Sequence, residues 1–243
     1  NEAVTITDTQ SATNVATFAD KTTSAVTATI TDGVVATTLT TITGHVDAND
    51  VIKFKTTDKT VDASDLVALK VLVDTLDVSA VTAITEAAAN IGASGATVVS
   101  ALNIAGNDTA VTITTTTISA ADADAIADKT SGVVTATIAA ETATALNTAL
   151  VTNGDTTLNA YKLTVNGETA NATVLNALDG KTSVTVNAAA IKNIEGTATA
   201  VKAAYDANAL KTISGLGNET VDLTGATDAN ASLVKAINDY TTG

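Results

Sequence analysis

Carboxylates set in turns are the residues of this sequence best suited to chemistry. They form four local groups: Asp47 with Asn49 and Asp50, Asp62 with Asp65, Asp122 with Asp124, and Asn107 with Asp108. Hard oxygen ligands of this kind are what Ca²⁺ takes from carboxylates and main-chain carbonyls. None of the groups forms an EF-hand loop or a glycine-rich nonapeptide, and an Asp that begins a helix also stabilises the helix dipole. Calcium binding therefore stays open, and no other cofactor is indicated.

The single histidine, His45, follows Gly44 in a polar stretch. A zinc site needs several nitrogen or sulfur ligands, and a hydrolytic triad needs a nucleophile and an orienting group beside the imidazole. The chain has no cysteine to contribute to either. We interpret His45 as a turn residue without assembled partners. We predict no catalytic and no cofactor-binding residues, and hence no enzyme.

Threonine alternates with apolar residues in several runs, at Thr5 and Thr7, Thr27 and Thr29, Thr112 and Thr114, and Thr135 and Thr137. Parallel stacking of such strands would align these side chains on one face, as in solenoid ice-binding proteins. Lys53, Lys55, Lys162 and Asp222 fall at equivalent outward positions and would interrupt a regular plane. Threonine is also simply a favourable strand residue. Ice binding is therefore an alternative to a purely structural role.

The elements that hold these residues are built from a narrow set of amino acids. The 243 residues include 48 Ala and 50 Thr but no Pro, Cys, Met or Trp, and the 45% hydrophobic fraction is enough to bury a core. All 12 basic residues are Lys, and the net charge is −14, which disfavours nucleic acid as a partner. No run approaches the ~18 apolar residues that span a bilayer. We expect no nucleic-acid partner and no membrane insertion.

A long internal repeat is the strongest signal in the chain. Residues 19–30 recur at 127–138, and residues 178–182 are a third copy of the same hinge. We predict one continuous repeat array over residues 1–243, with approximate super-repeats 1–108 and 109–216 and a partial third at 217–243. The absence of an initiator Met and the repeats at both ends indicate a segment of a longer chain.

A shorter period lies within the long one. Apolar residues alternate with polar ones in runs that begin near Val4, Val26, Ile52, Val81, Val111, Val134, Tyr161, Val184 and Val221. This alternation predicts short strands with one buried face. Most segments between the runs open with Ser, Thr, Asp or Asn and then place apolar residues at helical spacing, which predicts short helices. These segments are residues 11–20, 62–76, 119–128, 172–178, 197–207 and 228–238.

A strand and a short helix repeated at this period predict an α/β solenoid, in which short parallel β-strands alternate with short Ala-rich helices. Val and Ile should point inward and Thr outward. A β-sandwich would instead space its strands ~8–12 residues apart without helices. A solenoid exposes an unpaired strand at each end, and neither Pro nor a charge cluster blunts these ends. We therefore predict end-to-end stacking, onto neighbouring repeats or another copy.

Residues 175–182 and 213–221, together with the Val-Thr-Ala-Thr-Ile strands at 26–30 and 134–138, carry a family resemblance. They resemble repeats in very long secreted cell-surface proteins of marine unicellular cyanobacteria, a group that includes giant proteins linked to swimming and to the outer cell coat. The resemblance implies a secreted, surface-associated structural array, with cell-surface glycans or the coat as further partners. It transfers no site residues.

These observations together predict a non-enzymatic, extracellular structural repeat protein that self-associates into a rod, a filament or a surface layer. The alternative is a binding module, either a calcium-dependent adhesin or an ice-binding protein with a threonine array.

Overall fold

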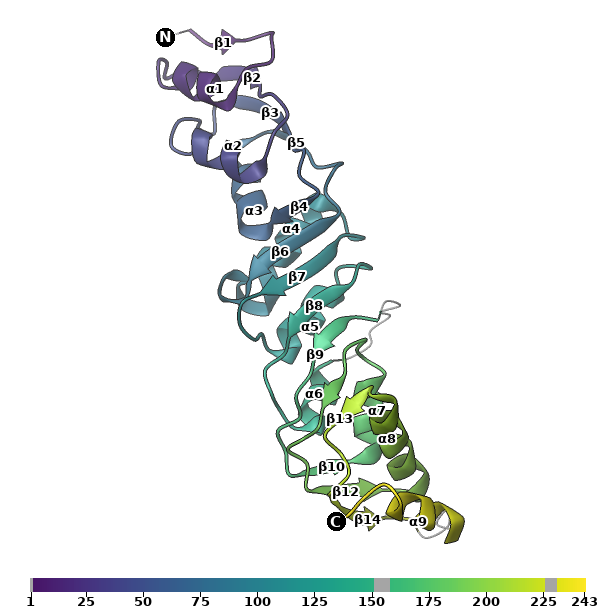
Figure 1. The fold of residues 1–243 in the computed structure, drawn as a ribbon. Helices are drawn as coiled ribbons and strands as arrows, with labels where there is room; N and C mark the ends of the chain where they lie inside the picture. Colours follow the sequence, from purple (N-terminus) through teal and green to yellow (C-terminus); the bar gives the residue numbers. More distant parts are fainter. Residues whose placement is uncertain (1, 151–157, 226–230) are drawn as a thin grey trace. The chain divides into compact units, whose positions relative to one another are not determined.

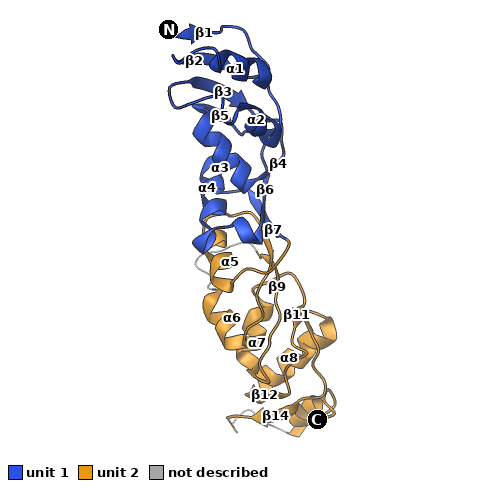
Figure 2. Ribbon diagram, turned by 90° about the vertical axis from the view of Figure 1, so that its left-hand side faces the viewer, with its two compact units in different colours: residues 1–114 blue, residues 115–243 orange. Residues whose placement is uncertain are grey.

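The computed structural model describes residues 2–150, 158–225 and 231–243 of the chain. Strands and helices alternate along it, and the strand pairs within each unit are parallel (Figure 1). The chain divides into two compact units, residues 1–114 and 115–243 (Figure 2). The predicted class, α/β with parallel strands alternating with helices, is confirmed.

Unit 1 consists of short strands and short helices. Its strands are β1 (Val4–Thr5), β2 (Val26–Thr29), β3 (Val51–Lys55), β4 (Thr60–Asp62), β5 (Thr75–Asp77), β6 (Ala83–Ala87) and β7 (Ala110–Thr114). Its helices are α1 (Ala12–Ala19), α2 (Val35–Ile42), α3 (Ala63–Leu72) and α4 (Ala96–Ala105), with short 3₁₀ turns η1 (Ala88–Asn90) and η2 (Ala93–Gly95) before α4.

Unit 2 has the same alternation. Its strands are β8 (Val134–Thr137), β9 (Ala160–Lys162), β10 (Thr169–Asn171), β11 (Val186–Asn187), β12 (Asn193–Gly196), β13 (Ile213–Ser214) and β14 (Thr220–Leu223). Its helices are α5 (Ala120–Ala127), α6 (Ala143–Ala149), α7 (Ala172–Asp179), α8 (Ala198–Leu210) and α9 (Ala231–Asn238).

Neighbouring strands in a sheet come from successive stretches of the chain. In unit 1, β1, β2, β3 and β5 pair in that order, as do β4, β6 and β7; in unit 2, β10, β12 and β14 form one such series. Val4 lies opposite Val26, and Asn193 lies opposite Thr220. The helices also contact their successors, α1 to α4 within unit 1 and α5 to α9 within unit 2. Within these series, each strand except the last is therefore followed in its sheet by a strand from a later stretch of the chain.

The side-chain alternation that predicted the strands sets the core. In β7, Val111 and Ile113 are buried while Thr112 and Thr114 are exposed, as expected for a strand with one buried face. Helix starts follow the predicted cap chemistry, because the Ser11 hydroxyl accepts a hydrogen bond from the main-chain N–H of Asn14 at 3.1 Å. The inward position of Val and Ile is confirmed for β7, whereas Val51 of β3 points outward.

The predicted helix over residues 62–76 was too long. Helix α3 ends at Leu72, and Leu76 lies in β5 instead of in the helix. The Lys70 ammonium donates to the carbonyls of Val73 at 3.2 Å and Asp74 at 3.0 Å, and the Asp74 N–H donates to the Ile52 carbonyl at 2.9 Å. Pairing with β3 therefore draws the chain out of the helix, which its own sequence pattern did not indicate.

Several elements were not predicted. Helices α2, α4 and α6 and strands β4, β5, β10, β12 and β13 lie outside the predicted runs, and α8 continues to Leu210, beyond the predicted end at residue 207. For the predicted helix over 228–238, α9 accounts for Ala231–Asn238, and residues 228–230 lie outside the described part of the chain.

Candidate functional site

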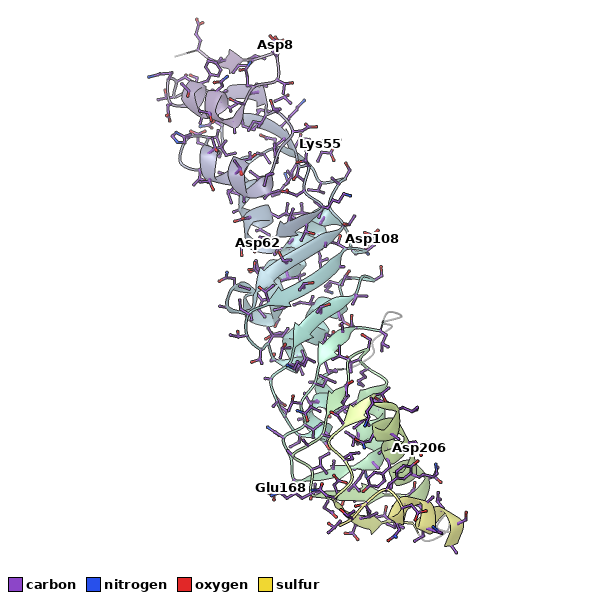
Figure 3. All side chains as sticks on the ribbon, viewed as in Figure 1. Asp8, Lys55, Asp62, Asp108, Glu168 and Asp206 are labelled. Carbon is purple, nitrogen blue, oxygen red and sulfur yellow. The ribbon has the colours of Figure 1, made fainter. Side chains whose placement is uncertain are left out.

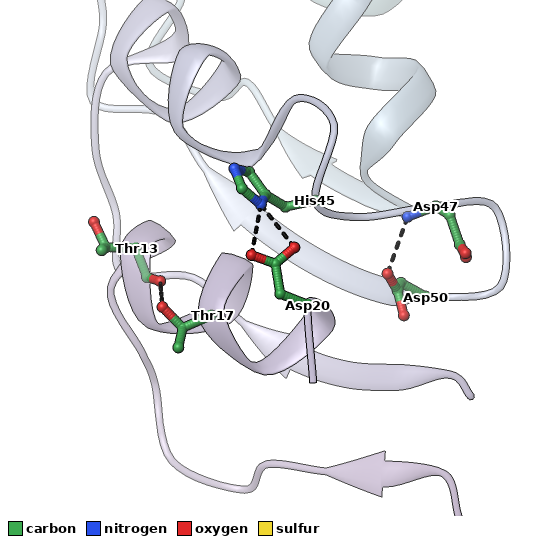
Figure 4. A network of polar contacts seen from close by, with 6 residues as sticks. All are labelled: Thr13, Thr17, Asp20, His45, Asp47 and Asp50. Carbon is green, nitrogen blue, oxygen red and sulfur yellow. Dashed lines mark hydrogen bonds and ion pairs between the residues drawn. The ribbon is translucent and has the colours of Figure 1, made fainter. Parts of the chain in front are cut away.

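The turn between α2 and β3 holds the first predicted calcium group, Asp47, Asn49 and Asp50. Asp47 Oδ1 accepts a hydrogen bond from the Asn49 main-chain N–H at 2.8 Å. Asp50 is 8% exposed, and one of its carboxylate oxygens accepts from the main-chain N–H of Val26 at 2.7 Å. The other accepts from the main-chain N–H of Asp47 at 3.0 Å (Figure 4). The Asp50 carboxylate therefore links the turn to β2, whereas the Asp47 carboxylate binds only within the turn.

Asp50 belongs to a series of Asp and Asn residues that each precede a strand and bind the neighbouring one. Asp74, before β5, accepts from the Ile52 N–H at 2.9 Å, and Asn159, before β9, accepts from the Val134 N–H at 2.8 Å. Each donor lies at the start of its strand, where the ladder to the next strand has not yet begun. A buried N–H without a partner costs about 1–3 kcal/mol. These side chains therefore complete the ladders.

Sequence reasoning missed this series. In the sequence, each member is an Asp or Asn that lies directly before a strand. It follows the start of the preceding strand in the sheet by 22 to 25 residues. Of its members, only Asp50 was singled out, and for calcium binding.

The second predicted calcium group, Asp62 and Asp65, begins helix α3. Asp62 Oδ1 accepts from the main-chain N–H groups of Ser64 at 3.0 Å and Asp65 at 3.2 Å, which is a helix N-cap. Glu86 of β6, which is 1% exposed, accepts from the Ser64 N–H at 2.9 Å and from its hydroxyl. Partial burial, together with the charges of Asp62 and Glu86, raises the pKa of the Asp65 carboxyl. These carboxylates therefore bind main-chain N–H groups, and their negative charges repel one another.

The third group, Asp122 and Asp124, lies in helix α5. The Ser119 hydroxyl donates to Asp122 Oδ2 at 2.7 Å and accepts from the Asp122 N–H at 3.0 Å. Burial lowers the pKa of the Lys181 ammonium, an effect that the charge of Asp124 opposes. Lys181 Nζ in turn donates to the Asn147 carbonyl at 3.1 Å, near the end of α6. Asp122 therefore interacts with Ser119 at the start of α5, whereas the charge of Asp124 acts on Lys181.

Within unit 1, the fold does not bring the predicted calcium groups together. Asn107 and Asp108 are exposed in the loop before β7, and Asp108 is drawn on a different side of unit 1 from Asp62 (Figure 3). Over residues 2–150, 158–225 and 231–243, no three His, Cys, Asp or Glu side chains are arranged to hold a metal ion. A hollow of about 340 Å³ beside Asp50 and Asp74 is lined by carboxylates that already accept main-chain hydrogen bonds.

His45 has a partner that the sequence did not reveal. Its Nδ1 lies 2.9 Å from Oδ1 and 3.0 Å from Oδ2 of Asp20, the residue that directly follows α1 (Figure 4). The two side chains are 41% and 51% exposed, so this is a surface pair, of a kind that contributes about 0–1 kcal/mol. The expectation of a histidine without assembled partners was wrong, because residues 25 positions apart meet where the two helical segments stack.

The register shows how the outward threonines align. Thr5 lies opposite Thr27, but Thr27 lies opposite Val51 on its other side, and Thr29 lies opposite Lys53. An apolar or charged side chain therefore interrupts the threonine row within one or two strands. The sequence predicted the interruption at Lys53, and also one at Lys162, which lies opposite Thr137.

Strand β1 ends the first sheet of unit 1, and its apolar packing is unfinished. Val4 is 37% exposed, although its register partner Val26 is 0% exposed. The N–H groups of Val4 and Ile6 donate to carbonyls of the β2 segment at 2.9 Å and 2.8 Å. Since alternate residues of a strand direct their main-chain groups to opposite sides, the N–H and C=O of Thr5 point away from β2. We call these two groups the β1 edge.

Strand β14 ends a sheet of unit 2 in a corresponding way. Its inward residues Val221 and Leu223 are half-exposed, whereas Ile194, the register partner of Val221, is 0% exposed. The N–H groups of Thr220 and Thr224 donate to carbonyls of the β12 segment at 2.9 Å and 2.8 Å. The main-chain groups of Val221 and Leu223 therefore point away from β12. We call them the β14 edge.

The segment just before β14 is covered by the last residues of the chain. The Tyr240 ring stacks on Tyr205 with centroids 5.8 Å apart, and the Thr242 N–H donates to the Gly217 carbonyl at 2.9 Å. Glu219, which is fully buried, accepts from the Gly217 N–H at 2.8 Å and from the Tyr205 hydroxyl at 3.2 Å. Burial raises the pKa of Tyr205 to about 12. These contacts fasten the end of unit 2 beside the β14 edge.

Comparison with models of known protein families finds no match, and comparison with curated proteins finds no relative. In the described part of the chain, no helix has the length and apolar character needed to cross a membrane. The basis for a function is therefore the arrangement of strands, caps and open edges.

Proposed function

We propose that this chain is a non-enzymatic structural repeat protein: an α/β solenoid that self-associates outside the cell into a rod, a filament or a surface layer. The observation that carries the proposal is the strand register. Parallel partners come from successive strand–helix stretches, and inward residues of successive strands form shared apolar columns. In such an array each repeat is stabilised by its neighbours.

The predicted super-repeats agree with the positions of the elements. Helix α1 begins at Ala12 and α5 at Ala120, and β2 begins at Val26 and β8 at Val134. Both pairs have the same offset as the sequence repeat that relates residues 19–30 to 127–138. This supports an array with super-repeats 1–108 and 109–216 and a partial third at 217–243.

The β1 edge and the β14 edge support the proposed self-association. A strand edge with unpaired main-chain groups is a template for another strand, and apolar residues left half-exposed beside it add a reason for a partner to bind. Val4 at the β1 edge, and Val221 and Leu223 at the β14 edge, have this character. The proposed partner is an identical or neighbouring repeat, with cell-surface glycans or the coat as further partners.

The proposed location and the lack of catalysis rest on composition. The surface is supplied by Thr, Asn and Asp, and the chain has one His and no Cys. His45 is exposed and bound to Asp20, which argues for a structural use of the imidazole. The resemblance to secreted cyanobacterial surface repeats supports an extracellular role.

The binding-module alternatives have less support. A calcium-dependent adhesin needs carboxylates that converge, whereas Asp50 and Asp62 accept main-chain hydrogen bonds and Asp122 accepts one from the Ser119 hydroxyl. An ice-binding face needs a regular row of threonines, whereas Val51 and Lys53 interrupt the row in unit 1.

Electron microscopy of the purified chain, with and without a calcium chelator, tests the proposal. We expect filaments or a lattice in both samples, because main-chain pairing and apolar burial need no metal. Separate particles in both samples would contradict self-association. Assemblies that disperse on chelation would instead support the calcium-dependent adhesin. A sample in urea, in which the strands are unfolded, serves as the control for non-specific deposits.

A further inference from the structure

Two of the three tyrosines in this chain stack on each other inside unit 2. The Tyr205 and Tyr240 rings have centroids 5.8 Å apart and an interplanar angle of 14°. Nearly parallel rings at this separation are offset, so their faces overlap only in part. Tyr205, in helix α8, is 1% exposed, whereas Tyr240, which follows α9, is 40% exposed. One ring of the pair is therefore buried, and the other is open to solvent.

Each phenol of the pair donates a hydrogen bond to a carboxyl group. The Tyr240 hydroxyl donates to Asp206 Oδ1 at 2.9 Å, and the Tyr205 hydroxyl donates to Glu219 Oε2 at 3.2 Å. The Lys202 ammonium, 2.6 Å from Oδ2 of Asp206 (Figure 3), lowers the pKa of that carboxyl, which is therefore ionised at neutral pH. Burial raises the pKa of Tyr205 to about 12, and the hydrogen bond to Asp206 raises the pKa of Tyr240. Both phenols therefore keep their protons at neutral pH, and each faces an oxygen that can accept one.

A phenol held in this way loses an electron more easily than a free one, because its proton passes to the hydrogen-bonded oxygen in the same step. Tyrosine is also the most easily oxidised residue type of these 243 residues, since Cys, Met and Trp do not occur. The third tyrosine, Tyr161, is 3% exposed and donates to the main-chain carbonyl of Ala123 at 3.3 Å, an oxygen much less basic than a carboxylate. An oxidant in solution therefore reaches Tyr240 first, and Tyr205 lies against it.

We propose that Tyr205 and Tyr240 form an intramolecular dityrosine cross-link when an external one-electron oxidant acts on the folded chain. This inference does not depend on the proposed self-association. Each phenol loses one electron to the oxidant and its hydroxyl proton to the carboxyl group beside it. The two radicals join through a carbon–carbon bond between the ring positions next to the hydroxyls, and the hydrogen on each of these carbons moves to the phenolic oxygen. Two equivalents of oxidant are reduced, and two protons reach solvent through the carboxyl groups.

The contacts around the pair keep the two rings together only in the folded chain. The Thr241 hydroxyl donates to the Glu219 carbonyl at 2.8 Å, and the Thr242 N–H donates to the Gly217 carbonyl at 2.9 Å. These bonds hold the segment of Tyr240 on the turn before β14, beside helix α8. The new bond would tie this segment to α8 covalently, so that urea no longer separates them.

A photo-oxidised ruthenium complex, with persulfate as the final electron acceptor, supplies the one-electron oxidant for a test. In the folded wild type at low protein concentration, we expect a monomer that has lost two hydrogen atoms and has the fluorescence of dityrosine. Cleavage after lysine should then give residues 203–211, which include Tyr205, joined to residues 236–243, which include Tyr240. The same treatment in urea should give almost no intramolecular product, because the rings are no longer held together.

Phenylalanine variants identify the residues. Tyr205→Phe and Tyr240→Phe keep a ring in the stack but cannot form the phenolic radical, so each should lose the cross-link. Tyr161→Phe is the matched control and should cross-link like the wild type. Asp206→Asn keeps a hydrogen-bond acceptor but removes the base, so it should slow cross-linking several-fold; Asp222→Asn, which changes an exposed carboxylate of β14, should not. Circular dichroism that matches the wild type establishes that the variants are folded.

The remaining outcomes overturn the proposal. A folded wild type that forms no dityrosine, or forms it only in covalent dimers, would show that the stacked pair does not couple within one chain. An intramolecular cross-link that persists in Tyr205→Phe or Tyr240→Phe would place the reaction at other residues. An unchanged rate in Asp206→Asn would contradict the role of this carboxylate as the proton acceptor of Tyr240.

Discussion

Strands β1 and β2 each have a valine at the same position of the strand register, but the two valines have different surroundings. Val4 and Val26 are paired across the two strands, yet the first is 37% exposed and the second 0% exposed. The difference is that β2 has neighbouring strands on both sides, whereas β1 has one. Whether a residue of this protein is buried therefore depends on the neighbouring repeat as much as on the residue type.

Replacing each of these valines with alanine measures that difference directly. We expect Val26→Ala to lower the free energy of unfolding by about 2 kcal/mol, because it leaves a cavity in a closed column, and Val4→Ala to lower it by less than about 0.5 kcal/mol. Urea unfolding at low protein concentration checks both values. Equal losses at the two sites would mean that β1 is as well packed as β2, which would contradict the contrast.

A smaller effect is expected from the caps that join successive strands. Asp50→Ala leaves the Val26 N–H buried without its partner, so we expect a loss of about 1.5 kcal/mol. Asp47→Ala is the matched control, since Asp47 lies in the same turn but accepts only a local, exposed hydrogen bond; we expect a loss below about 0.5 kcal/mol. Urea unfolding of the two variants, followed by circular dichroism, makes the comparison. A loss for Asp47→Ala as large as that for Asp50→Ala would show that the turn, and not the link to β2, is what matters.

The parts of this fold that the sequence predicted correctly are those set by residues close together in the chain. The alternation of Val111, Thr112, Ile113 and Thr114 identified a strand, and Ser119 identified the start of α5, because each signal depends on residues close together in the chain. Helix α2 was missed since Val34 offers no side-chain cap. Its Val35 N–H is instead bound at 2.8 Å by Asp58, which is 23 residues away.

The candidate sites were less predictable for the same reason. Asp50 and His45 were recognised as polar turn residues, but their partners, Val26 and Asp20, come from the preceding strand–helix stretch. Composition alone could not show whether Asp50 binds a cation or a main-chain N–H. The repeat spacing contained this information, because Asp and Asn recur before strands at the distance that separates parallel partners.

The smallest predicted effects are those of pH, and they should have opposite signs at two acids. The pKa of Asp65, near the buried Glu86, is raised by burial and by the charges of Asp62 and Glu86. The pKa of Asp206 in α8 is lowered, chiefly by its hydrogen bond to Lys202. Ionised Asp65 therefore costs stability at neutral pH, a cost relieved as pH falls through its folded pKa. Ionised Asp206 stabilises the fold above pH 3.8. This stabilisation is lost as the pH falls through the pKa of Asp206 in the folded state.

Asparagine variants separate these two contributions. We expect Asp65→Asn to raise the urea midpoint at pH 7 and Asp206→Asn to lower it slightly, since Asp206 is partly exposed and its ion pair is screened. Both differences from the wild type should shrink as the pH falls below 3.8. A lower midpoint for Asp65→Asn at pH 7 would show that this carboxylate stabilises α3 when ionised, contrary to its repulsive surroundings.

The central claim is that the unfinished ends stack through main-chain pairing and apolar burial, against the repulsion of a net charge of −14 per chain. Sedimentation velocity of the wild-type chain across a salt series tests it most directly. Raising NaCl from about 10 mM to about 500 mM screens like charges and leaves apolar burial intact. We predict that the weight-average sedimentation coefficient rises with both protein and salt concentration. A monomer under all conditions, or assemblies that dissolve as salt is raised, would contradict the claim.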